Sequence, residues 1–223
     1  MLDNPNLWSY NWPNMEINHI SFLRKLDRLV LRLNEAVYGK AFPNLKRVKQ
    51  ITSSYCGPAA LVSLFSFLGV RTSQGRIVRS LRAENKIKDS GLVIKDFARG
   101  VRIAGKGEFT FWKKEDATIG DLDKIVNMYK FPVGVEWQGV FYEDEEGDNG
   151  HYCVITQVNK SKGYLKLADP YKKFAGLDRK FRISDFEKRW WDVNGLVYDR
   201  KLMFLITSKK ETFPRYLGMI RVN

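Results

Sequence analysis

The sequence is poor in the residues that build cross-linked scaffolds and metal cages. Its 223 residues include two cysteines and two histidines. Two cysteines cannot form a disulfide framework or a four-thiolate zinc site, and two histidines leave too few ligands for a zinc cage. The sequence therefore predicts neither a metal site nor a cofactor, and any chemistry must come from its own side chains.

Long apolar runs are also missing. No stretch approaches the roughly eighteen apolar residues of a membrane-spanning helix. Residues 1–14, MLDNPNLWSYNWPN, lack the basic cap and apolar run of a secretory signal. We therefore expect a cytoplasmic protein. A content of 44% hydrophobic and 28% charged residues is typical of a globular chain with a core, not of a disordered one.

Negative charge is scarce as well, since 38 basic residues face 25 acidic ones and the net charge is +13. Such an excess points first to an anionic partner. However, acidic residues outnumber basic ones between residues 101 and 150, no basic run is longer than two residues, and RNA-recognition and zinc-finger signatures are missing. We therefore interpret the charge as a solvated surface and expect no nucleic-acid partner.

An amphipathic helix is predicted over roughly residues 16–38. One apolar stripe with three- and four-residue spacing consists of Leu23, Leu26, Val30, Leu33 and Val37. Such a stripe usually packs on the chain's own core. The alternatives are contact with a partner helix or a membrane surface through residues 17–38. We expect residues 1–44 to form an arm and helix that extend the main domain.

Helical patterns come first in the main domain, and strand patterns follow. The segment CGPAALVSLFSFLG predicts a buried helix with Pro58 in its first turn and Gly69 at its end. Further helices are predicted at 72–82, 92–103 and 118–130, and strands at 133–138, 152–158, 163–168 and 202–207. Capping-box spacing occurs at Thr118 and Asp121, and again at Ser184 and Glu187 before Trp190 and Trp191. This order predicts an α+β domain over residues 45–208 with a C-terminal tail, 209–223.

Cys56 is the most informative residue. It directly precedes Gly57-Pro58 and the apolar helix, so its sulfur is expected at a helix N-terminus, where the partial positive charge favours thiolate over thiol. The small residues that follow let other groups approach the sulfur. A buried, inert cysteine is the alternative interpretation, and position alone does not separate the two.

A thiolate nucleophile needs a base, and only His19 and His151 are available. His19 has no acidic or glycine context. His151 opens the strand HYCVITQV after Asn149-Gly150, where it can reach into a cleft. The turn at 159–162 folds this strand against GYLKLADP, so the start of the first strand lies beside Asp169 at the end of the second. Asp169 can then orient the imidazole, although a turn aspartate before proline is common.

Gln50 lies six residues before Cys56. The tetrahedral oxyanion of thiol acyl transfer needs hydrogen-bond donors, and the Cys56 backbone N–H and the Gln50 side-chain amide can supply them. A lone glutamine carries no information, so the weight of Gln50 comes from its distance to Cys56.

Together these motifs resemble the bacteriocin-processing family of papain-like cysteine peptidases (cysteine peptidase family 39) and its standalone relatives. The resemblance rests on Gln50 in KQITSSYCGPAALVSLFSFLG, on His151 and Asp169 in GHYCVITQVNKSKGYLKLADP, and on ISDFEKRWW, and it covers about residues 45–207. It implies a papain-like fold and a thiol peptidase that cleaves leader peptides, typically after a double glycine. Cys56 would be the nucleophile, His151 the base, Asp169 its orienting partner and Gln50 the oxyanion donor.

Two departures from the family stand out. Tyr55 precedes the cysteine where many members have an acidic residue, and the membrane helices and ATPase of the transporter-linked members are not in this sequence. Two other interpretations stay open: a catalytically silent relative that binds a peptide, and a thiol enzyme that transfers the acyl group to an amine, as transglutaminase-like enzymes do.

Three neighbouring features have a functional and a structural interpretation. Cys153 shares a strand face with His151 and can form an inhibitory disulfide with Cys56, or serve as a small core residue. The acidic loop 143–148 can favour basic substrates, raise the imidazole pKa or bind a cation, or be solvated. Trp190 and Trp191 are expected to pack under the hairpin.

Overall fold

The computed structural model describes residues 29, 41–141, 149–194 and 197–222. The chain divides into two units, Met1–Gly39 and Lys40–Asn223. Of the first unit only Leu29 is described, a helical residue with 54% of its surface exposed. The rest of the helix predicted over 16–38 lies outside the described residues, as does the acidic loop 143–148.

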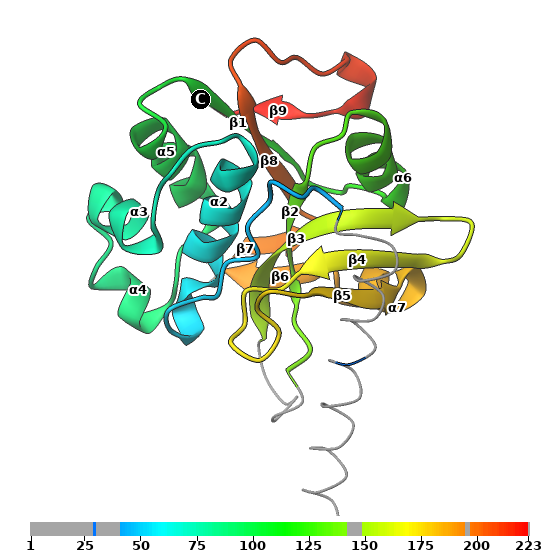
Figure 1. The fold of residues 1–223 in the computed structure, drawn as a ribbon, viewed down its shortest axis with the longest axis horizontal. Helices are drawn as coiled ribbons and strands as arrows, with labels where there is room; N and C mark the ends of the chain where they lie inside the picture. The colour runs from blue at the N-terminus through cyan, green and yellow to red at the C-terminus, as the bar shows by residue number, and fades with distance from the viewer. Residues whose placement is uncertain (1–28, 30–40, 142–148, 195–196, 223) are drawn as a thin grey trace, which may run out of the picture. The chain divides into compact units, whose positions relative to one another are not determined.

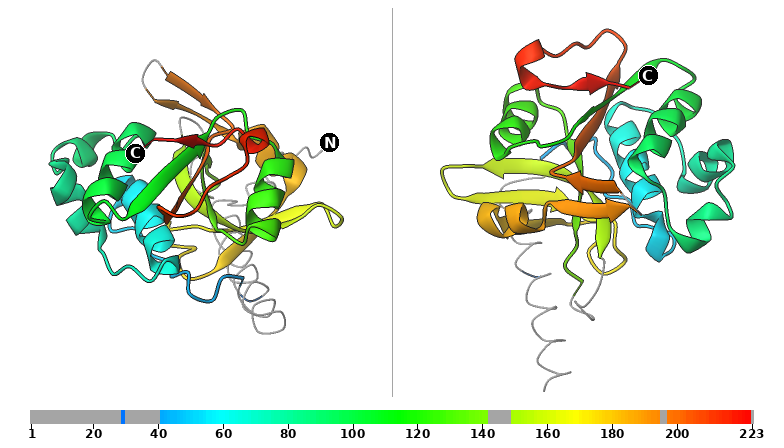
Figure 2. Two further views of the ribbon diagram at one scale, coloured as in Figure 1. Left: turned by 90° about the horizontal axis from the view of Figure 1, so that it is seen from above. Right: turned by 180° about the vertical axis from the view of Figure 1, so that it is seen from behind.

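An antiparallel seven-stranded sheet forms the centre of this unit, in the order β5-β4-β3-β2-β8-β1-β9 (Figure 1). Its strands are β1 (Phe109–Lys114), β2 (Val133–Gln138), β3 (Gly150–Asn159), β4 (Tyr164–Ala168), β5 (Asp178–Arg182), β8 (Met203–Ser208) and β9 (Ile220–Arg221). Two further strands, β6 (Trp191–Asn194) and β7 (Val197–Arg200), pair with each other and form a ribbon of their own beside the sheet (Figure 2).

Helices cover both sides of the sheet. On one side lie α2 (Cys56–Phe67), α3 (Gln74–Leu81), α4 (Lys86–Asp89) and α5 (Ile94–Ala104). On the other side lie α6 (Ile119–Asp123) and α7 (Ile183–Arg189). Two apolar cores result, one beneath α2, α3 and α5 and one beneath α6 and α7. The α+β class predicted from the sequence is confirmed. In the described ranges, every helix falls short of the length and hydrophobicity that a bilayer crossing needs.

Strand β3 separates the two cores. Tyr152 and Val154 belong to the core beneath α2, whereas Cys153 and Ile155 belong to the opposite core. This alternation follows from the pleat of a strand, whose successive side chains point to opposite faces. The predicted hairpin is confirmed, because β3 pairs with β4 from Val154 opposite Ala168 onward, with a bulge on the way.

Helix α2 begins and ends where the sequence predicts. Pro58 stands in its first turn, where the missing N–H removes no helical bond, and Gly69 follows its end with φ +75°. The Thr118–Asp121 capping box is also confirmed, since each side chain accepts from the other residue's backbone N–H. The predicted helix that follows is divided, however: α6 is succeeded by a π-helical turn, η2 (Lys124–Met128).

Other local predictions were wrong or incomplete. The Ser184–Glu187 capping box does not form, because α7 already begins at Ile183 after Arg182 and its N-cap has no side-chain hydrogen bond. Strands β1, β5, β6, β7 and β9 were not predicted. Three of them, β5, β7 and β9, are short and carry charged residues. They lie at an edge of the main sheet or in the separate ribbon, where solvated side chains hide the apolar–polar alternation by which a strand is predicted.

The two tryptophans after α7 have different surroundings. Trp190 is buried in the core beneath α7 and donates from Nε1 to the Leu202 carbonyl, 2.9 Å away. Trp191 instead stacks on Tyr198 in the two-stranded ribbon. Residues 209–222 add β9 beside β1 and bury Leu217 in the core beneath α6 and α7.

Candidate active site

Cys56 is the first residue of α2, directly after a 3₁₀ turn, η1 (Ser53–Tyr55). It is half-buried, and its thiol is not part of a disulfide. The next residue must be small: a Cβ at Gly57 would lie 2.9 Å from Cζ of Phe97. Glycine therefore lets the start of α2 approach the aromatic core closely.

The loop before Cys56 is fixed by a buried amide. Gln74, at the start of α3, donates from Nε2 to the Lys49 carbonyl (2.8 Å) and accepts from the Ile51 N–H (3.1 Å). The backbone N–H of Gln50 donates to the Pro170 carbonyl at 2.8 Å. These bonds tie the segment that leads to the nucleophile to the turn that follows Asp169.

The Gln50 side chain is only 4% exposed. Its Nε2 donates to the carbonyls of Thr52 and Ser53, both at 2.8 Å, so the amide points back at its own loop. Its Oε1 is buried without a hydrogen-bond partner. For Gln50 to act as an oxyanion donor, the amide must leave one of the two carbonyls.

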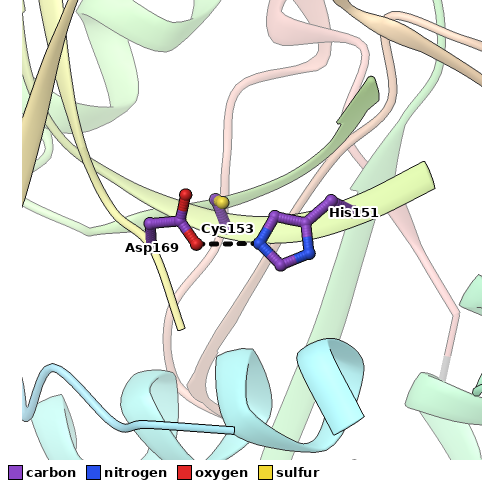
Figure 3. Close-up of side chains that lie close together, drawn as sticks. All are labelled: His151, Cys153 and Asp169. Atoms are coloured by element: carbon purple, nitrogen blue, oxygen red, sulfur yellow. Dashed lines mark hydrogen bonds and ion pairs between the residues drawn. The ribbon is translucent and has the colours of Figure 1, made fainter. Parts of the chain in front are cut away.

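His151 and Asp169 form a buried pair. The imidazole Nε2 and the carboxylate Oδ1 are 2.8 Å apart, and the side chains are 3% and 0% exposed (Figure 3). The backbone N–H of Tyr171 donates to the same Oδ1 at 2.9 Å. With Nε2 on the carboxylate, Nδ1 is the nitrogen left to face a reacting group, as the orienting role predicted for Asp169 requires.

Arg179 holds the second carboxylate oxygen of Asp169, a contact that was not predicted from the sequence. Its Nη1 lies 2.6 Å from Oδ2 of Asp169, and its Nη2 donates to the Val140 carbonyl at 3.0 Å. The guanidinium also lies over the Phe174 ring, 3.6 Å from its centroid. The only signal in the sequence is a basic residue in DRKFR, which reads as an exposed charge. Its importance arises from the pairing of β4 with β5.

Aromatic rings cover the pair from outside. The Phe141 ring meets the His151 ring edge-on at 5.0 Å between centroids, and Tyr171 lies 4.8 Å from Phe141. Such a cover excludes water from the imidazole–carboxylate bond and strengthens it.

Charge and burial act in opposite directions on the pKa values here. Burial alone would lower the pKa of His151, but its contacts with Cys153 and Asp169 outweigh burial and hold that pKa well above the usual value. Burial would raise the pKa of Asp169, yet His151 and Arg179 bring it down to about 2. Because burial raises the pKa of the Cys153 thiol to about 11, that thiol is neutral at pH 7. The Asp169 carboxylate therefore carries the charge that keeps His151 protonated.

Cys153 lies beside this pair. One ligand atom each of His151, Cys153 and Asp169 lies within 4.8 Å of the others, close enough to share a metal ion (Figure 3). These atoms are already engaged, however, since Trp137 Nε1 donates to the Cys153 sulfur at 3.3 Å and Arg179 holds Asp169. A metal ion there would have to compete with a buried guanidinium.

The structure brings His151 and Asp169 together, and it places Cys56 near the same strand. Helix α2 packs against β3, and Cys56 is close enough to Tyr152, the residue after His151, to contribute with burial and Glu136 to a raised tyrosine pKa. Among the described residues, no hydrogen bond joins the Cys56 sulfur to His151. His151 pairs with Trp137 and shares the Cys153 face of β3, whereas Tyr152 points to the face that α2 covers, so the imidazole would have to turn toward the thiol for the two to react.

Comparison with known proteins identifies the fold. No curated protein sequence matches the chain. Among solved structures, the peptidase domain of Streptococcus ComA, a bi-functional ABC transporter, is similar with a TM-score of 0.52 and 19% identity, over 73% of this chain and 97% of that domain. A double glycine motif protease from an AMS/PCAT transporter, in complex with the leader peptide, has a TM-score of 0.47 and 13% identity, over 73% and 90%. The family model for the Peptidase_C39 like family matches residues 42–197, and the chain therefore belongs to that family.

Proposed function

We propose that the protein is a cysteine peptidase in which Cys56, His151 and Asp169 act as nucleophile, base and orienting acid. The observation that carries this proposal is the buried His151–Asp169 pair at 2.8 Å. His151 belongs to β3, the strand against which the Cys56 helix packs. Membership of the family and the peptidase fold support it. Domain boundaries at residues 44/45 and 208/209 are part of the same proposal.

The side chains divide the reaction as follows. The Cys56 thiolate attacks the scissile carbonyl carbon, and the carbonyl electrons move to oxygen. Collapse of this oxyanion breaks the C–N bond while His151 gives its proton to the leaving amine, which leaves a thioester on Cys56. Water then attacks the thioester, His151 takes one of its protons, and the released thiolate is restored. Asp169, held by Arg179, keeps the imidazole in the tautomer and orientation that both proton transfers need.

Gln50 is proposed to stabilise the oxyanion together with the backbone N–H of Cys56. Its amide lies six residues from the nucleophile and is already buried next to η1. Transfer of one N–H from the Ser53 carbonyl to the oxyanion would exchange a neutral hydrogen bond for a charge-assisted one, which is roughly twice as strong.

The substrate class proposed is a peptide, with leader-like or glycine-rich segments as the specific candidates. We also propose a cytoplasmic location. A membrane or partner-helix contact through residues 17–38 is testable by liposome co-sedimentation with and without residues 1–40.

The deciding experiment is digestion of a random peptide library, read by mass spectrometry. We expect wild type to cleave it, Cys56→Ala to be inactive, and Cys153→Ala, the matched control, to cleave the same bonds. Binding without cleavage by wild type would instead identify a silent relative. Amide formation with an added amine, in place of hydrolysis, would identify an acyl transferase.

A further inference from the structure

A cavity of about 360 Å³ lies next to the candidate active site. One wall is formed by residues 49–53, which lead into η1 and Cys56. The other wall is formed by Tyr171 and Lys172, which follow Asp169-Pro170. The volume is within the range of binding pockets for small ligands. Since both walls are continuous with proposed catalytic residues, a side chain bound here would belong to a residue close to the scissile bond.

The walls of the cavity are held rigidly. The backbone bond from Gln50 N–H to the Pro170 carbonyl joins them at 2.8 Å. Gln74 fixes the backbone on both sides of Gln50, and the Tyr171 ring packs on Phe141, which covers His151. A ligand in the cavity would therefore meet a preformed surface, and little ordering would be needed on binding.

The polar groups of the cavity specify what can bind. Gln50 is one of the lining residues, but its Oε1 is buried, so the charged side chains are the polar groups that a ligand can reach. Lys49 and Lys172, both exposed, lie on opposite walls, and none of the lining residues is acidic. A carboxylate matches this charge, because it can pair with both lysines.

We propose that this cavity is a substrate subsite that binds the carboxylate of a peptide residue near the scissile bond. The carboxylate would lie between Lys49 and Lys172. An Asp or Glu side chain and a peptide C-terminus share this chemistry. The proposal deepens the peptidase function above and rests on it for the position of the scissile bond.

The test uses full-length protein and fluorescent peptides from the cleaved library, in matched pairs with Glu or Gln at each position around the cleaved bond. We expect one position at which Glu raises kcat/KM about tenfold over Gln at low salt, and less at high salt. The double variant Lys49→Glu/Lys172→Glu should lose or reverse that preference. Lys209→Glu/Lys210→Glu, with the same change of charge at exposed positions outside the cavity, should keep it. Peptides with an amidated C-terminus distinguish a terminal carboxylate from a side chain.

Failure of the subsite and failure of the peptidase function give different results. Cleavage by wild type with equal rates for Glu and Gln at every position, free and amidated, would overturn the subsite and leave the peptidase intact. A preference that survives in Lys49→Glu/Lys172→Glu would overturn it too. If wild type cleaves nothing, fluorescence anisotropy of the same peptides still tests the cavity: tighter binding of Glu peptides that Lys49→Glu/Lys172→Glu abolishes supports it, and equal binding refutes it.

Discussion

The two cysteines occupy regions with opposite chemistry. Cys56 is half-buried at the N-terminus of a twelve-residue helix. Cys153 is fully buried in the middle of a sheet, accepts from Trp137, and has a pKa that burial raises to about 11. The imidazole of His151 has its carboxylate partner on the Cys153 side, yet the accessible sulfur is at Cys56. The two side chains are chemically identical, so their positions, one at the start of a helix and the other inside a sheet, decide which thiol can react.

Substitution of the two cysteines breaks this comparison most strongly. Cys56→Ala should lower peptide cleavage by at least about 10⁴-fold, because no other nucleophile can form the thioester. Cys153→Ala should cost less than about tenfold, because it leaves the hydrogen bond between His151 and Asp169 in place. Initial rates on one library-derived peptide measure both. Equal losses in the two variants would mean that the sulfur beside the imidazole, and not the one on α2, carries the chemistry.

Asp169→Asn removes the charge on the Cys153 side of the imidazole. We expect kcat to fall by on the order of 10³- to 10⁴-fold through loss of the correct tautomer. The alkaline limb of the remaining activity should shift to lower pH. Asp169 helps to hold the pKa of His151 above its usual value, and the protonated ring is needed to give a proton to the leaving amine. The pH profile of kcat/KM measures this, with exposed Asp185→Asn as control. An unshifted limb would contradict the role of Asp169.

Arg179→Met tests whether the carboxylate itself needs support. Removal of one partner of a buried ion pair leaves the other charge uncompensated, so the free energy of unfolding should fall by about 3 kcal/mol. Arg182→Met on the same strand, at a side chain that is 84% exposed and ion-paired with Asp185, should change it by less than about 0.5 kcal/mol. Urea denaturation compares the two. Equal effects would show that Arg179 is not a special support.

Gln50→Ala sharpens the comparison at the Cys56 end. Loss of one oxyanion donor should lower kcat by about a hundredfold and leave KM nearly unchanged. Gln50→Glu keeps the size and the acceptor but removes the N–H groups, so it should lose as much. Steady-state kinetics on the same peptide measure both. Full activity in Gln50→Glu would show that the amide stays on the Thr52 and Ser53 carbonyls during turnover.

The sequence predicted what depends on local pattern. Neighbouring residues define a period, a turn or a cap, and these predicted three features. They are helix α2 with Pro58 in its first turn and Gly69 after its end, the strand 133–138, and the β3–β4 hairpin. The His151–Asp169 contact followed because the hairpin geometry alone brings these two positions together. The position of Cys56 at the start of α2 followed from the Gly57-Pro58 pair after it.

The remaining features depend on distant segments. Arg179 reads as a surface charge until β5 pairs with β4 and places it against Asp169. Gln74 fixes the Gln50 loop from the start of α3, more than twenty residues away along the chain. The direction of the Gln50 amide depends on two loop carbonyls, and no spacing in the sequence encodes such a choice.

The most direct test of the account is the rate at which iodoacetamide alkylates each cysteine at pH 6, read by mass spectrometry of the intact protein and its peptides. The account predicts that Cys56 reacts much faster than Cys153, and that His151→Ala slows Cys56 because the imidazolium that stabilises its thiolate is gone. Equally slow labelling of both cysteines, or a Cys56 rate that does not change in His151→Ala, would contradict a Cys56–His151 pair.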